Sequence, residues 1–200
     1  MMPPKLLAPA PLALALLGFA LLSACASTPA ATVDVAAEQI PAPLAEAERD
    51  FQSYLRAHRL PTGGESHNLQ QVMQEKFSAF EPVRAAFGRA LTDERPALAG
   101  FAAYRIGQLY LNFACEVEAI EPLEALEEDQ KEEFRAGMRD QAAPLVVRAL
   151  DAMKRAQVQD STPWSARAAE VVAALSVADD SGRSLPAQCA ATTRHWQAPE

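Results

Sequence analysis

The sequence predicts an all-α domain of about five helices, arranged as antiparallel hairpins. Along residues 43–178 apolar side chains recur at steps of three and four, which is the spacing of one face of a helix. Prolines and glycines separate these stretches, and no segment of useful length alternates apolar and polar residues as a half-buried strand does. We therefore expect a helical domain over residues 43–178 and an irregular C-terminal tail over residues 179–200.

The first two helices are expected to form a hairpin across a turn rich in proline and glycine. One helix should run from Pro43, which fits a first helical turn, to about Leu60. Its apolar face consists of Leu44, Ala47, Phe51, Tyr54, Leu55 and His58. Asn68 and Gln71 resemble a capping box at the start of the second helix. The apolar stripe of that helix consists of Leu69, Val72, Met73, Phe77, Phe80, Val83, Phe87 and Leu91. Pro82 lies inside the stripe and should kink or split the helix.

The third helix is expected from Pro96 to about Ala119 and has two apolar sides. One side consists of Leu98, Ala102, Ile106, Leu109 and Phe113, and the opposite side of Tyr104, Leu111 and Cys115. A helix that is apolar on two sides is usually covered from both directions. We therefore expect this helix to be central.

An acidic stretch, Glu116 to Glu133, follows and is expected to be a solvated loop and helix start. The fourth helix should run from Glu127 to Gln157 and bend at Pro144. Its core side consists of Phe134, Met138, Ala142, Leu145, Ala149, Met153 and Ala156. A fifth helix should begin near Pro163. Its buried side consists of Trp164, Ala168, Val171, Ala174 and Leu175.

The N-terminus has the order of a secretory leader, with Lys5 as its one charge and an apolar run up to Leu22. Leu22, Ser23, Ala24 and Cys25 resemble the lipobox of bacterial lipoproteins. The resemblance implies a signal peptide over residues 1–24, cleavage between Ala24 and Cys25, and lipid on Cys25. Residues 25–42 are then a lipidated flexible tether, because Ala, Thr and Pro predominate there. An ordinary secretory signal with a chance cysteine is the alternative. Ala26 is not the aspartate of an inner-membrane retention signal, which favours the outer membrane.

The mature chain is acidic. Of the 18 basic residues only Lys5 lies in the leader, whereas all 26 acidic residues follow it, so the mature net charge is −9. A surface of this sign repels phosphate backbones, and nucleic acid is therefore not an expected partner. The membrane contact is expected through the lipid on Cys25 rather than through basic residues.

Assigning Cys25 to lipid leaves Cys115 and Cys189 in an exported, oxidising compartment, where disulfides persist. We expect a disulfide between them, with two free thiols as the alternative. Such a bond would contribute about 4 kcal/mol in the chain-entropy model. It would also let the C-terminal tail cover the side of the third helix that carries Tyr104 and Leu111.

The third helix also resembles the first helix of a tetratricopeptide repeat, a family of helical hairpins that bind proteins. The packing residues that this resemblance implies are Ile106, Gly107 and Tyr110 in the first helix, Ala149, Met153 and Ala156 in the second, and Trp164 and Ala168 at the start of the next repeat. Ala103 and Arg167 depart from the family pattern, and the two helices are separated by more chain than a repeat of about 34 residues allows. A generic antiparallel bundle is the alternative to a divergent array.

The sequence carries no local motif for catalysis, since HExxH, GxSxG and a glycine-rich phosphate loop are missing. His58 and His67, with Glu65 between them, and the distant His195 do not have the spacing of a structural zinc site. We therefore expect no catalytic residue, no metal and no cofactor. The leading hypothesis is a membrane-anchored module that binds or assembles an unidentified envelope protein. The alternatives are a carrier or inhibitor that binds an apolar ligand or an enzyme, and a hydrolase with an unrecognised site.

Overall fold

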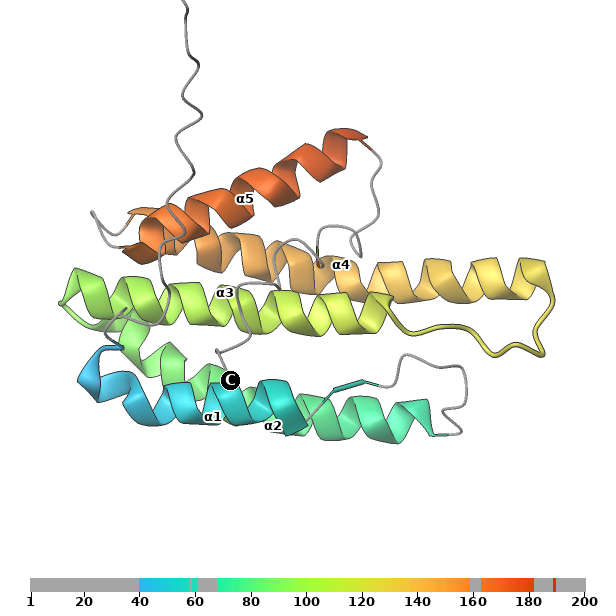
Figure 1. The fold of residues 1–200 in the computed structure, drawn as a ribbon, viewed down its shortest axis with the longest axis horizontal. Helices are drawn as coiled ribbons and strands as arrows, with labels where there is room; N and C mark the ends of the chain where they lie inside the picture. Colours follow the sequence, from blue (N-terminus) through green and yellow to red (C-terminus); the bar gives the residue numbers. More distant parts are fainter. Residues whose placement is uncertain (1–39, 58, 61–67, 159–162, 182–188, 190–200) are drawn as a thin grey trace, which may run out of the picture. The chain divides into compact units, whose positions relative to one another are not determined.

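The computed structural model describes residues 40–57, 59–60, 68–158, 163–181 and 189, all within one compact unit, Val35–Glu200. Within these residues it contains five α-helices and no strand, which confirms the predicted all-α fold (Figure 1). The helices are α1 (Ala45–Ala57), α2 (Leu69–Gly88), α3 (Pro96–Glu118), α4 (Glu128–Val158) and α5 (Pro163–Ser181), with short 3-10 segments η2 (Ala42–Leu44) before α1 and η3 (Arg89–Thr92) after α2. None of the helices in this part of the chain is long and apolar enough to cross a membrane.

The central helix of the domain is α3. In Figure 1 it lies between the α1–α2 pair and the α4–α5 pair, and it packs against α2, η3, α4 and α5. Both of its predicted apolar sides are buried, one with Leu98, Ala102, Ile106, Leu109 and Phe113, the other with Tyr104, Leu111 and Cys115. The prediction of a central helix is therefore confirmed, and its two apolar sides explain why the other helices lie on both sides of it.

Two prolines lie inside helices without interrupting them. α2 continues through Pro82 and α4 continues through Pro144. Of the two outcomes expected at Pro82, a kink or a split, the split is therefore excluded. Both prolines are exposed. Water can therefore bond to the carbonyl that each proline leaves without a donor.

The start of α2 differs from the predicted capping box. Asn68 precedes the helix, but its side chain makes no hydrogen bond to the backbone of the first turn. Its amide instead donates to the side-chain oxygen of Gln71. Each of the two amide groups carries both a donor and an acceptor, so the side chains bond to each other.

The buried sides of α4 and α5 agree with the predicted ones at all but one position. In α4, Ala142, Ala149, Met153 and Ala156 are buried, and Phe134, Met138 and Leu145 pack against the core with part of their surface exposed. In α5, Trp164, Ala168, Val171 and Leu175 are buried. Ala174 is exposed, contrary to prediction, and Val172 packs against the core instead. At 100° per residue Ala174 lies about 90° from the centre of the buried stripe, which explains its exposure.

Candidate binding groove

The residues singled out by the tetratricopeptide resemblance pack α3 against α4. Ile106 and Gly107 of α3 and Ala149, Met153 and Ala156 of α4 are buried. A Cβ atom at Gly107 would lie 2.8 to 2.9 Å from three atoms of the Met153 side chain. The glycine thus permits the close approach of α3 and α4 that the sequence predicts.

Trp164, at the start of α5, covers the side of α3 that carries Tyr104. The centroid of its ring lies 4.6 Å from that of Phe101 and 5.6 Å from that of Tyr104. Ala168, one turn later, is completely buried. Helix α5 therefore provides cover that the sequence analysis assigned to the tail, and residues 190–200 of that tail lie outside the described residues.

Cys115 and Cys189 form the expected disulfide. Their Cα atoms are 5.7 Å apart, and the bond closes a separation of 74 residues. Both cysteines are buried. The bond fastens the segment after α5 to the C-terminal half of the central helix.

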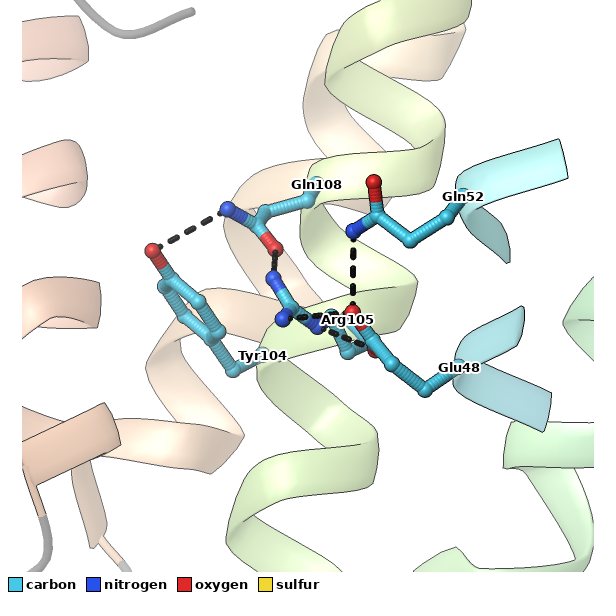
Figure 2. A network of polar contacts seen from close by, with 5 residues as sticks. All are labelled: Glu48, Gln52, Tyr104, Arg105 and Gln108. Carbon is cyan, nitrogen blue, oxygen red and sulfur yellow. Dashed lines mark hydrogen bonds and ion pairs between the residues drawn. The ribbon is translucent and has the colours of Figure 1, made fainter. Parts of the chain in front are cut away.

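A network of buried polar groups joins α1 to α3 (Figure 2). Arg105 donates from Nε and Nη2 to the two oxygens of Glu48, over 2.7 and 2.8 Å. Gln52 donates to the same carboxylate, and Gln108 bonds to both Arg105 and Tyr104. Glu48 is only 5% exposed and Gln108 only 1%. We call these five residues the polar seam.

The guanidinium group of Arg105 is also surrounded by aromatic rings. Its central carbon lies 5.1 to 5.9 Å from the ring centroids of Phe51, Phe101, Tyr104 and Trp164. Aromatic ring faces attract a cation at these distances. Arg105 therefore carries both an ion pair and ring contacts that together hold α1, α3 and α5.

A second buried cation, Lys76 of α2, lies near the other end of α3. Its amine is 3.0 Å from the Glu116 carboxylate and 4.5 Å from the centroid of the Tyr54 ring, and its side chain is 1% exposed. Burial lowers the pKa of the Lys76 amine, while the charge and hydrogen bond of Glu116 act in the opposite direction. Burial, and secondarily Glu116, raise the pKa of the Tyr54 phenol. Glu116 also accepts a hydrogen bond from the backbone of Leu60, so the prediction that it lies in a solvated acidic stretch is wrong.

Glu48, Lys76 and Arg105 are not among the residues predicted from the sequence, although their spacing contains a signal. Glu48 lies four residues after Leu44 and three before Phe51, both of which are buried. Each of the three charged residues thus lies in register with an apolar helical stripe. A charge at such a position is buried with the stripe, and it then needs a partner of opposite sign.

An apolar pocket of about 590 Å³ opens between α2 and α4, and Phe113 of α3 also lines it. Its lining residues are Leu69, Gln70, Met73, Gln74 and Phe77 of α2, Phe113 of α3, and Met138 and Gln141 of α4. No charged side chain is among them. Methionine adapts its shape to different apolar partners, and the three glutamines can donate or accept hydrogen bonds. The pocket therefore suits an uncharged, apolar group.

Phe77 is the large apolar residue that the pocket leaves exposed. The sequence predicts it in the buried stripe of α2, but it is 46% exposed, so this prediction is wrong. Its ring stacks on that of Phe80, with the centroids 6.2 Å apart. Phe80 in turn contacts Phe113 and Tyr110, at 5.7 and 5.0 Å between centroids. Phe80 is itself buried, at 1% exposed, so the aromatic row runs beneath the surface from the pocket to the partly exposed Tyr110. We call the pocket, together with Tyr110 at the end of this row, the groove.

The remaining predicted site residues lie outside the described part of the chain. These are Leu22, Ser23, Ala24 and Cys25 of the lipobox. The three histidines His58, His67 and His195, for which no site is expected, also lie outside it. Among the residues that the structure does describe, no cluster of three or more His, Cys, Asp and Glu side chains could hold a metal ion.

Neither protein-family models, nor curated protein sequences, nor solved structures give a match to this chain, so the tetratricopeptide resemblance stays a prediction.

Proposed function

We propose that the protein is an outer-membrane lipoprotein whose helical domain binds another protein of the cell envelope as an interaction or assembly module. The observation that carries this proposal is the groove with its half-exposed Phe77. Large exposed aromatic residues beside an apolar pocket are typical of surfaces that a partner covers. The lipobox and the tether of residues 25–42 support attachment to a membrane, from which the domain can reach its partner.

The buried charges support binding rather than catalysis. A general acid or base needs a carboxyl or amine that is available to a substrate. Glu48 is held by Arg105, and Glu116 by Lys76, in ion pairs inside the domain. We therefore assign no catalytic step to these groups.

Site-specific photo-cross-linking in cells tests the binding role. We expect Phe77→p-benzoylphenylalanine to give one or a few discrete cross-linked products, because the ring would lie at the interface. Val147 of α4 is also exposed but does not line the pocket, and it provides the matched control position. The same products from both positions, or none from Phe77, would contradict a protein partner in the groove.

Metabolic labelling with a fatty-acid precursor tests the anchor. The wild-type protein should be labelled and the Cys25→Ser variant should not. An unlabelled wild-type protein that retains Met1 would exclude the lipoprotein assignment.

Thiol counting on the denatured, unreduced mature protein should find no free thiol, as expected for a disulfide formed after export.

A second candidate function is that of a carrier for an apolar small molecule. The volume of the pocket, about 590 Å³, and its lack of charged lining residues favour it. Native mass spectrometry after mild extraction separates the two candidates, because a carrier should retain a ligand of defined mass and an interaction module should retain a protein.

A further inference from the structure

The groove has a second end, which differs in charge from the pocket. Arg148 of α4 is exposed, and its guanidinium carbon lies 5.8 Å from the centroid of the Tyr110 ring. No ion pair of Arg148 occurs within the described residues. Arg84 of α2 lies close enough to interact electrostatically with Tyr110, and its own partner is Glu81 in the same helix. Two arginines thus lie near Tyr110 in a chain whose net charge is −8.

The two ends of the groove are two helical turns apart. Gln141 lines the pocket and Arg148 follows seven residues later in α4, which corresponds to about 10.5 Å along the helix and the same face. Phe80 connects the two ends, because it contacts both Phe113 in the pocket and Tyr110 beside Arg148. Phe80 is only 1% exposed and lies beneath a bound segment, but a segment that lies along this face of α4 reaches both the pocket and Arg148.

We propose that the groove binds an amphipathic helix of a partner protein, with an apolar side chain in the pocket and an acidic side chain, seven residues away, at Arg148. This inference rests on the proposed function as a protein-binding module. The charge of Arg148 requires the acid, and the uncharged lining of the pocket requires the apolar residue. The pocket is lined by residues of the helices α2, α3 and α4, so a further helix can pack into the groove as helices do in a bundle.

A peptide selection tests this inference without knowledge of the natural partner. The probe is a displayed library of helical 18-residue peptides, selected on the mature lipoprotein held in lipid nanodiscs, so that no detergent occupies the apolar pocket. We expect selected peptides to carry a large apolar residue and, seven residues along the same face, Asp or Glu. Binding of a selected peptide should weaken at least about tenfold in both Phe77→Ser and Arg148→Glu.

Two further variants make the assignment specific. Selection on Arg148→Glu should favour Lys or Arg at the position seven residues from the apolar anchor. Arg155→Glu, two turns further along α4 and equally exposed, should keep the original preference with the same change of net charge. Thermal unfolding of each variant establishes that a loss of binding does not reflect a loss of fold.

The possible outcomes distinguish a failure of the groove as the binding site from a failure of the proposed function. Peptides that bind equally well to Phe77→Ser and Arg148→Glu would overturn the groove as the site while leaving a protein-binding role intact. A library that yields no binder at all would overturn the helical occupant, whereas the absence of a Phe77 cross-link in cells would contradict the protein-binding role itself. Binding of the fluorescent fatty acid cis-parinaric acid that depends on Arg148, with no peptide selected, would overturn the helical occupant in favour of a carrier.

Discussion

The polar seam and the groove both lie on α3, but they are built in opposite ways. In the seam, the buried Glu48 is bonded to the largely covered Arg105, and aromatic rings surround the cation. In the groove, no charged side chain lines the pocket, and Phe77 remains half exposed. The seam brings α1 into contact with α3, whereas the pocket is open to a ligand.

This difference separates residues that specify the fold from residues that are available for binding. A buried carboxylate without its partner is strongly unfavourable, so Glu48 selects the one position of α1 that brings it to Arg105. Apolar contacts are less directional, and the methionines and Phe77 of the groove can adapt to different partners. We therefore expect substitutions in the seam to change stability and substitutions in the groove to change binding.

The largest effect should come from breaking the seam. Arg105→Met leaves the Glu48 carboxylate buried without its cation, and we expect a loss of about 3–5 kcal/mol in the free energy of unfolding, measured by urea denaturation. Arg135→Met removes an exposed ion pair with Glu132, which water screens, and should lower the free energy of unfolding far less. Equal losses in the two variants would show that the seam does not specify the position of α1.

An intermediate loss of stability is expected at Gly107, where α3 lies close to α4. Gly107→Ala places a methyl group against Met153 and should destabilise the domain by about 1–3 kcal/mol. Gly137→Ala, in α4, meets nothing within 4 Å and should stabilise it by about 0.5–1 kcal/mol, because alanine favours the helix. Thermal unfolding of both variants measures the difference. A stabilising effect at Gly107 would mean that the two helices have room to separate.

Substitutions in the groove should change the free energy of unfolding much less. Phe77→Ser removes a half-exposed ring that stacks on Phe80, and we expect a loss below about 1 kcal/mol, in contrast to the loss of binding proposed above. Val147→Ser provides the exposed control. A loss of several kcal/mol at Phe77 would place this residue with the core rather than with the groove.

The smallest effect concerns Glu118, near the end of α3. One of its carboxylate oxygens is buried without a hydrogen-bond partner among the described residues, and burial raises its pKa above the usual 4.5. Between the ordinary pKa of the unfolded state and the raised pKa of the folded state, the folded protein holds more protons than the unfolded one. Glu118 therefore lowers the free energy of unfolding as the pH rises through this interval. The stability of Glu118→Gln relative to wild type should therefore improve as the pH rises above the ordinary carboxyl pKa of 4.5, as measured by urea denaturation.

Glu128 provides a control, because its contribution to stability depends on pH in the opposite direction. Its hydrogen bond and ion pair with Lys131 lower its pKa, so its contribution is lost as the pH falls. Glu128→Gln should therefore become less stable relative to wild type as the pH rises. The same pH dependence in both variants would refute the assignment at Glu118.

The sequence predicts the helices well and the surface poorly, for physical reasons. The two apolar sides of α3 can be recognised from periodicity because both are continuous, as Leu109 and Leu111 illustrate. Phe77 has the spacing of a core residue, and nothing in the sequence states which helix will cover it. Its exposure depends on where α4 lies relative to α2, and that arrangement follows from contacts such as Gly107 against Met153. Periodicity thus predicts which residues can be buried, whereas the tertiary arrangement determines which of them are buried.

The ion pair between Glu48 and Arg105 joins residues that are 57 positions apart and ties the first helix of the domain to its centre. If the protein is held by lipid on Cys25 as proposed, tension on a bound partner is transmitted through the tether into α1. The two parallel hydrogen bonds of this pair, together with the buried Leu44 and Ala47 that precede it, then carry that load. As the force increases, α1 should detach before the helices that form the groove. The domain would then lengthen while the partner stays bound.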